Sequence, residues 1–286
     1  MGVAVVTDST SCLPPRRAEE EGLTVVPLHV LVAGEDRVAA REISPGEVAE
    51  ILGRGKERIS TSMVSPGEFV DAFREVADRT GCHEIVSVHL SGRISGTVES
   101  ARAAAAELAD ELRVMVVDSG VLGMALGYAA CTGARVAAGG AGVEEVAAAV
   151  EARAAGTRTW FYVDTLEHLR RGGRIGRAKA LLGSALAIKP LLTIREGEVA
   201  AQEKVRTRAK ALSRLVDRAA EAVSEAGGPD SGVEVAVHEL AAREAAEELA
   251  ASLAERTGVT PEIVELDPVV GSHTGPGTLA VVVAPR

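Results

Sequence analysis

Residues 84–101 read EIVSVHLSGRISGTVESA, and this stretch decides the fold class. Its first five residues predict a buried strand, and the alanine-rich run 103–112 predicts a helix. The Ser- and Gly-rich residues between them therefore form a turn at the carboxyl end of a strand, where open α/β sheets bind ligands. Hydroxyl groups and backbone N–H groups at a helix N-terminus suit an anion. The alternative for Ser95 is that it only caps the helix.

Strand and helix signals alternate through the first half of the chain. Besides 84–88, strands are predicted at 3–6, 24–32 and 113–117, and helices at 14–21, 70–78, 122–138 and 143–154. Two Ser-Pro-Gly-Glu segments, at 44–47 and 65–68, predict helix starts with capping boxes. The alternation predicts a mostly parallel sheet with helices on both faces.

The pattern changes after residue 156. Two apolar segments, 188–194 and 198–205, flank Glu196-Gly197, which is a hairpin signal and predicts antiparallel pairs. Small residues at 178–187 predict a helix, and GSHTGPG at 271–277 predicts a loop before the last strand. We therefore predict two α/β domains, 1–156 with a mostly parallel sheet and 157–286 with a mixed sheet.

Composition and charge exclude several classes of protein. The 286-residue chain has a net charge of −10 and only three Phe, two Tyr and one Trp. A nucleic-acid partner is therefore not expected, because phosphate backbones attract basic surfaces and single strands also need stacking aromatics. Three cysteines without a C-x-x-C pair indicate neither a disulfide framework nor a zinc site, which favours the cytoplasm. We also expect no signal peptide and no membrane-spanning segment.

Catalytic motifs are missing from the sequence. It contains no G-x-S-x-G elbow and no G-x-x-x-x-G-K-[ST] phosphate loop, and its six histidines lack the spacing of metal ligands. We therefore predict no metal site. Two alternatives stay open without a motif to support them: a serine hydrolase that acts on acyl esters through Ser95 and His273, and a binder of a phosphorylated metabolite at the same turns.

Two further segments contribute candidate ligand-binding residues. Thr61 and Ser62 lie in a hydroxyl-rich segment that the capping box at 65–68 does not require, although ordinary loop hydroxyls are an equal interpretation. His273 lies between glycines just before the last strand, where its ring can expose an N–H group to a ligand. A solvated loop histidine is the alternative.

Two arginines are candidates for contact with a partner. Arg174 follows two glycines that leave it sterically uncovered. Arg206 lies at a predicted helix start, where a positive charge gains nothing from the helix dipole. An ion pair or a partner contact is therefore expected for Arg206.

Short motifs spread over essentially the whole chain resemble, in their order and spacing, those of the DegV family. These motifs are TDST (7–10), TS (61–62), SGT with SA (95–97, 100–101), DS (118–119), DTL with GGRI (164–166, 172–175), IKP (188–190), RT (206–207) and HTGPG (273–277). The chain departs from the family pattern at two places. The family often has Gln-Pro where this chain has Met63-Val64, and an aromatic residue where it has Val98.

The DegV family includes the fatty-acid-binding subunit of bacterial fatty acid kinase. The resemblance implies two α/β domains that hold one long-chain fatty acid in a buried tunnel between them, with no catalytic residue and no cofactor. It also implies which groups bind the fatty acid carboxylate: Thr61, Ser62, Ser95, the Gly96 N–H group and His273.

The resemblance further implies protein partners. An ATP-dependent kinase subunit would phosphorylate the bound carboxylate to an acyl phosphate, and Arg174 and Arg206 would lie near the surface where it docks. The carrier would then deliver the acyl phosphate, with an acyltransferase at the membrane surface as a further partner.

Overall fold

The structure is a computed structural model that describes residues 2–55, 57–181 and 189–286. The described residues form two compact units. The first unit consists of residues 2–29 and Ser62–Gly156, and the second consists of Val30–Thr61 and Thr157–Arg286. The sequence-based division at residue 156 placed Val30–Thr61 in the first domain, whereas in the structure this segment belongs to the second unit. It joins the second unit because helix α2 (Pro45–Arg54) packs against helix α10 (Pro268–Thr274) there.

The first unit is built on a parallel sheet with the strand order β2-β1-β6-β7. Its strands are β1 (Val3–Asp8), β2 (Thr24–Val26), β6 (Glu84–His89) and β7 (Arg113–Asp118). All three neighbouring pairs run parallel, and in the central pair Val3 lies opposite Glu84 and Thr7 opposite Val88. The parallel sheet predicted for the first half is therefore confirmed.

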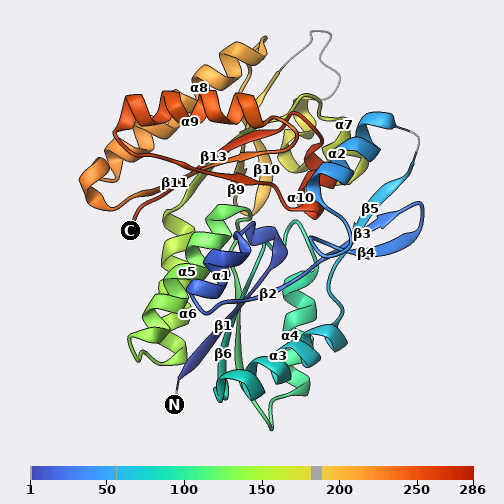
Figure 1. Cartoon of the computed structure of the whole chain (residues 1–286), viewed down its shortest axis with the longest axis vertical. Helices are drawn as coiled ribbons and strands as arrows, with labels where there is room; N and C mark the ends of the chain where they lie inside the picture. The colour runs from blue at the N-terminus through green and yellow to red at the C-terminus, as the bar shows by residue number, and fades with distance from the viewer. Residues whose placement is uncertain (1, 56, 182–188) are drawn as a thin grey trace. The chain divides into compact units, whose positions relative to one another are not determined.

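Helices cover both faces of this sheet. Helices α3 (Pro66–Thr80) and α4 (Thr97–Glu107) pack together on one face, and α5 (Met124–Ala138) and α6 (Val143–Gly156) pack together on the other (Figure 1). The short helix α1 (Pro15–Glu20) contacts β2. Both predicted capping boxes are present, at the starts of α2 and α3.

The strand predicted at 24–32 is two strands. The strand β2 ends at Val26, and the strand β3 (His29–Val32) begins after Pro27, which has no N–H group to donate to a sheet ladder. The second of these strands belongs to a separate three-stranded sheet with the order β4-β3-β5, completed by β4 (Glu35–Val38) and β5 (Ile59–Ser62). The hydroxyl-rich segment that contains Thr61 and Ser62 is therefore the end of a strand rather than a loop.

The second unit contains a six-stranded mixed sheet with the order β10-β9-β8-β13-β11-β12. Its strands are β8 (Arg158–Tyr162), β9 (Leu191–Arg195), β10 (Glu198–Glu203), β11 (Glu234–Glu239), β12 (Glu262–Glu265) and β13 (Leu279–Ala284). Only the β11–β12 pair is parallel among these neighbours, and β9 and β10 form the predicted hairpin at Glu196-Gly197. The mixed sheet predicted for the second half is confirmed.

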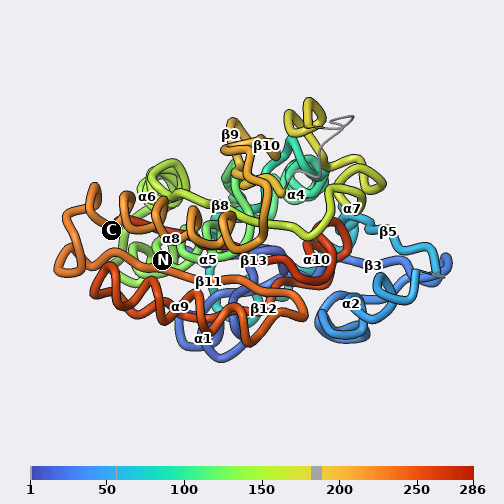
Figure 2. The backbone as a smooth tube through the Cα atoms, turned by 90° about the horizontal axis from the view of Figure 1, so that it is seen from above, coloured from blue at the N-terminus to red at the C-terminus, as the bar shows by residue number. Residues whose placement is uncertain are grey.

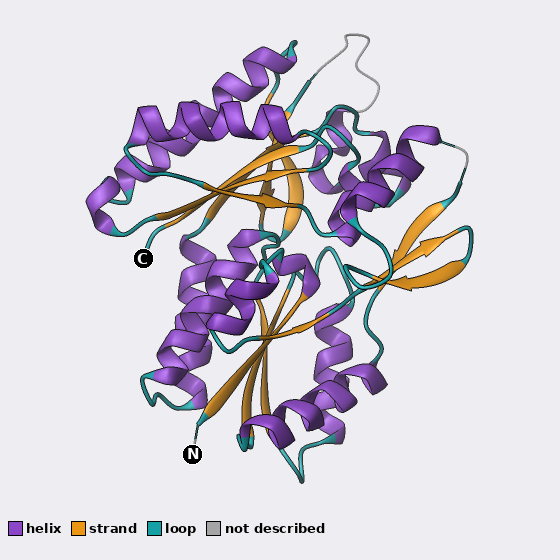
Figure 3. Cartoon of the chain, viewed as in Figure 1, coloured by secondary structure: helices purple, strands orange, loops and turns teal. Residues whose placement is uncertain are grey.

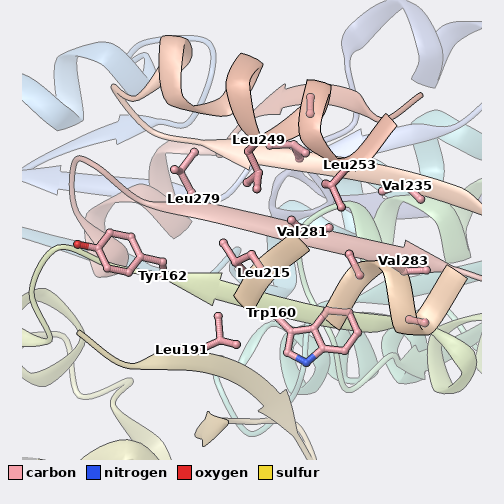
Figure 4. Close-up of a cluster of buried hydrophobic side chains, with 14 of the residues drawn as sticks. Trp160, Tyr162, Leu191, Leu215, Val235, Leu249, Leu253, Leu279, Val281 and Val283 are labelled. Carbon is pink, nitrogen blue, oxygen red and sulfur yellow. The ribbon is translucent and has the colours of Figure 1, made fainter. Parts of the chain in front are cut away.

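Helices α8 (Arg208–Glu225) and α9 (Arg243–Thr257) cover one face of the mixed sheet (Figure 3). Their buried side chains pack on strand residues such as Trp160 and Val281, with Leu215 and Leu249 from the two helices (Figure 4). Tyr162 lies in this cluster, and its hydroxyl group donates a hydrogen bond to Asp164 Oδ1 at 2.6 Å.

Short helices follow β8 and precede β13 in the second unit. Helix α10 packs against α2 and α7 (Glu167–Arg171) (Figure 2). A 3-10 helix, η2 (Gly176–Leu181), contacts β10, and the rest of the helix predicted at 178–187 lies outside the described residues. No helix in the described ranges is both long and apolar enough to span a membrane.

The loop predicted at 271–277 is largely a helix. Helix α10 begins with Pro268 in its first turn, and Asp267 Oδ1 accepts a hydrogen bond from the Val269 N–H group at 2.8 Å. It ends at Gly275, whose φ of 82° terminates the helical conformation. The glycines at 271, 275 and 277 predict a loop, but Asp267-Pro268 is a helix-start signal that the loop prediction did not include.

Candidate ligand-binding site

The turn after β6 presents an unused backbone donor in the first unit. Gly96 is the N-cap residue of α4 and supplies no side-chain cap. No described residue accepts a hydrogen bond from its N–H group. Because the first N–H groups of a helix lack partners within the helix and carry partial positive charge, this end of α4 suits an anion.

Ser95 lies beside this donor and is half-buried. Its Oγ atom is 2.9 Å from Thr97 Oγ1 and 3.4 Å from the Thr97 backbone nitrogen. The interpretation of Ser95 as the helix cap is therefore wrong, because Gly96 occupies the cap position and the contact with the Thr97 N–H group is long. When Thr97 Oγ1 donates to Ser95 Oγ, the Ser95 proton is left to donate to another group next to Gly96.

Met63 covers the same turn. Its side chain is 50% exposed, and its sulfur accepts a hydrogen bond from Ser100 Oγ at 3.3 Å. A Cβ atom on Gly96 would lie 2.8 Å from the Met63 sulfur, which is too close for any real contact. A larger residue at position 96 would therefore displace the Met63 side chain, and Met63 is a neighbour of this turn that the sequence signalled only by its departure from the family pattern.

A second donor pair lies in the second unit. Thr61, at the end of β5, and His273, in the last turn of α10, are joined by a 2.8 Å hydrogen bond between Oγ1 and Nε2. Burial and, to a smaller extent, the nearby charge of Arg174 lower the pKa of His273 to about 4. At neutral pH the imidazole is therefore uncharged, and the expectation of a solvated loop histidine is wrong.

The tautomer of His273 follows from its other nitrogen. Nδ1 is buried and has no hydrogen-bond partner among the described residues. Since an orphaned buried N–H group costs more than an orphaned acceptor, we assign the proton to Nε2, which then donates to Thr61 Oγ1. The Thr61 hydroxyl proton is thereby left to donate to another group.

Two glycine motifs hold the His273 region in place. A Cβ atom on Gly172 would lie 2.1 Å from His273 Nδ1, so the ring packs directly on a position without a side chain. Arg174 Nη1 donates to the Gly172 carbonyl oxygen at 2.7 Å. Glycine is favoured at Gly277 by its φ of 82°, and a Cβ atom there would lie 2.1 Å from Asp164 Oδ2. The GGRI, DTL and HTGPG motifs thus meet in one place.

The remaining candidates differ in their surroundings. Ser62 is half-buried, directly follows Thr61, and has no hydrogen bond to its hydroxyl in the described part of the chain. Arg206 is exposed just before Thr207, the N-cap residue of α8, and forms no ion pair with any residue that the structure describes. Arg174 is half-buried through its contact with Gly172.

A buried Ser–His–Asp chain was not anticipated. Asp8 Oδ2 lies 3.0 Å from His89 Nδ1, and His89 Nε2 lies 2.7 Å from Ser87 Oγ. This connectivity is that of a catalytic triad, but all three residues are 0% exposed. Ser87 is therefore inaccessible to an acyl ester. These three side chains instead form a buried hydrogen-bond network that links β1 to β6.

The hydrolase alternative gains no support from Ser95 and His273 either. Nε2 of His273, the atom that a hydrolase would use as its base, is bonded to Thr61. The described residues also contain no group of three or more His, Cys, Asp or Glu side chains that could hold a metal ion.

Comparisons with known proteins agree over the full length. The model of the family described as "Uncharacterised protein, DegV family" matches residues 2–286. A DegV domain-containing protein of Streptomyces coelicolor is 46% identical over 286 residues, which cover 99% of each chain. A DegV domain-containing protein of Mycobacterium tuberculosis is 35% identical over 285 residues, with 99% of this chain and 97% of the relative covered.

Solved structures give the same result. A DegV family protein of Thermus thermophilus, described by its fatty acid binding, matches with a TM-score of 0.88, 33% identity and full coverage of both chains. DegV of Bacillus subtilis, described as a fatty acid binding protein, matches with a TM-score of 0.89, 31% identity and full coverage of both chains. On this evidence the chain belongs to the DegV family.

Proposed function

We propose that this protein binds one long-chain fatty acid and holds its carboxylate by uncharged donors. The donors are the hydroxyl groups of Thr61, Ser62 and Ser95, the N–H group of Gly96 and the imidazole of His273. The observation that carries the proposal is the Thr61–His273 pair, in which a neutral imidazole leaves the threonine hydroxyl free to donate. The fatty acid binding of the Thermus and Bacillus relatives supports it.

The energetics suit a carrier. About sixteen buried methylene groups at ~0.8 kcal/mol each give a gross gain near ~13 kcal/mol, from which the costs of association are subtracted. A buried carboxylate would cancel much of this gain unless it were hydrogen-bonded. Neutral donors form these hydrogen bonds, and none of them acts as a general base that would activate a nucleophile. We therefore expect the protein to bind its ligand and not to hydrolyse acyl esters.

Replacing Ser95 with alanine tests the head-group site. We expect roughly 10- to 100-fold weaker binding of a long-chain fatty acid, because one hydrogen bond to a charged group contributes about 1.5–3 kcal/mol. Competitive displacement of a fluorescent fatty acid measures this affinity. The matched control is Ser252→Ala, since Ser252 is an exposed residue of α9 whose hydroxyl bonds only the Glu248 carbonyl oxygen. Unchanged affinity in Ser95→Ala would remove Ser95 from the site.

We further propose that the bound carboxylate is phosphorylated by an ATP-dependent kinase subunit and that an acyltransferase consumes the acyl phosphate. Arg206 supports a docking role because it is exposed and unpaired among the described residues, whereas Arg170 and Arg171 both pair with Glu167. Arg174 bonds Gly172, on which the His273 ring packs, and would be near the head group.

The variant Arg206→Ala is expected to bind fatty acid normally and to be phosphorylated roughly tenfold more slowly, as for an arginine at an interface centre. The measurement is acyl phosphate formation with a bacterial fatty acid kinase subunit and ATP. Arg243→Ala is the control, because Arg243 is an exposed arginine of α9 that pairs only within its own helix, with Glu247. Equal rates for the wild-type protein and Arg206→Ala would contradict the docking role.

A further inference from the structure

A buried carboxylate lies at the carboxyl end of β1. Asp8 is 0% exposed and is surrounded by four hydrogen-bonding groups. Its Oδ1 atom accepts from the Thr10 backbone N–H group at 3.0 Å and from the Thr10 hydroxyl at 2.5 Å. Its Oδ2 atom accepts from the Leu90 backbone N–H group at 3.0 Å and lies 3.0 Å from His89 Nδ1. Buried polar groups need hydrogen-bonding partners, and both oxygens of Asp8 have them.

The two oxygens of Asp8 serve different segments of the chain. Oδ1 binds the turn that follows β1, and Oδ2 binds the end of β6. The backbone ladder between these strands ends at the Thr7–Val88 pair. Beyond that pair, the hydrogen bonds of the Asp8 side chain to Thr10 and Leu90 connect the two strand ends.

Leu90 is the first residue of the turn that carries Ser95 and Gly96. Within this turn the Ser91 carbonyl oxygen accepts hydrogen bonds from the Ile94 and Ser95 N–H groups, at 2.9 and 3.1 Å. The position of Ser95 is therefore tied through Ser91 to the base of the turn at Leu90. Asp8 holds that base at Leu90, while the Val121 carbonyl oxygen accepts from the Ser91 N–H group at 3.0 Å on its other side.

We propose that Asp8 is a positioning residue that fixes the 90–96 turn so that Ser95 and Gly96 are preorganised for a carboxylate. This inference rests on the proposed function. Asp8 does not contact the ligand, because all four of its hydrogen-bonding partners are internal. Its loss therefore loosens the turn rather than removing a donor.

The test is Asp8→Asn, which keeps the size of the side chain but replaces one acceptor oxygen with an NH₂ donor. Either the turn after β1 or the turn after β6 then faces a donor instead of an acceptor. We expect fatty acid affinity to fall roughly tenfold and amide hydrogen exchange of residues 90–96 to accelerate. Both are measured well below the unfolding temperature, so that only folded protein is compared.

The control is Val88→Ala, which leaves a cavity in the neighbouring strand β6 without touching Asp8. This variant should unfold at a lower temperature and keep its affinity within about twofold. Equal losses of affinity in Asp8→Asn and Val88→Ala, or unchanged affinity in Asp8→Asn, would overturn the proposal. If Asp8→Asn does not fold, Thr10→Val removes one donor instead. Faster exchange of 90–96 in that variant supports the role, and unchanged exchange overturns it.

The exchange measurement separates this inference from the proposed function. It is made without ligand, so it reports whether Asp8 holds the turn even if the wild-type protein binds no fatty acid. A wild-type protein without affinity for fatty acids would refute the proposed function. Unchanged exchange in Asp8→Asn would refute the positioning role alone.

Discussion

Replacing Gly172 with alanine is expected to displace the His273 ring and to weaken fatty acid binding at least roughly tenfold, because misplacing a binding group by about 1 Å has effects of this size. The new Cβ atom would lie 2.1 Å from His273 Nδ1, so the ring must move away from Thr61. We also expect a loss of about 1–3 kcal/mol in the free energy of unfolding, as for other overpacked sites.

Gly173→Ala is the matched control for this experiment. Gly173 has a φ of 72°, so alanine there is strained by about 1 kcal/mol, but a Cβ atom would contact nothing within 4 Å. It should lower stability and leave the affinity unchanged. If both variants lost the same affinity, backbone strain rather than the His273 ring would explain the result, and the role given to Gly172 would be wrong.

The second large effect is a loss of stability in mild acid. Burial lowers the pKa of His238 and of His273 to about 4, from an ordinary value of 6.5. Between these values the unfolded chain binds protons that the folded chain excludes, so the free energy of unfolding falls as the pH falls from 6.5 toward 4. From pH 7 to pH 5 each histidine should contribute a loss of about 2 kcal/mol.

Urea unfolding of the wild-type protein and His238→Asn at pH 7 and pH 5 measures this effect. The ring of His238 is fully buried and its Nδ1 atom lies 3.1 Å from the Val264 carbonyl oxygen, a bond that an asparagine amide can replace. The variant should lose stability at pH 7 but show about 2 kcal/mol less dependence on pH, because asparagine does not titrate. The same pH dependence in both proteins would show that His238 is not buried in its neutral form.

Local signals in the sequence predicted much of the fold. Capping boxes at Ser44 and Ser65 and the hairpin at Glu196-Gly197 depend on neighbouring residues only, and the structure confirms them. The placement of Val30–Thr61 depends instead on packing between α2 and α10, more than 200 residues apart in the chain. Local signals do not contain that information.

The site was predicted less completely. The hydroxyl-rich segment and the glycines around His273 made Thr61 and His273 candidates, and the resemblance to the DegV family gave them a role. Only the structure brings them into contact across 212 residues. Gly172 was noted for exposing Arg174, whereas its main effect is to make room for the His273 ring. The Asp8–His89 pair has no local signal in the sequence, because contacts across parallel strands follow the register of the sheet.

The central claim is that the chain carries a fatty acid, and its most direct test is the lipid content of the purified protein. Organic extraction followed by mass spectrometry should yield about one long-chain fatty acid per chain, or should do so after incubation with excess fatty acid and removal of the unbound lipid. A protein that yields no fatty acid by either route, while remaining folded, would contradict the account.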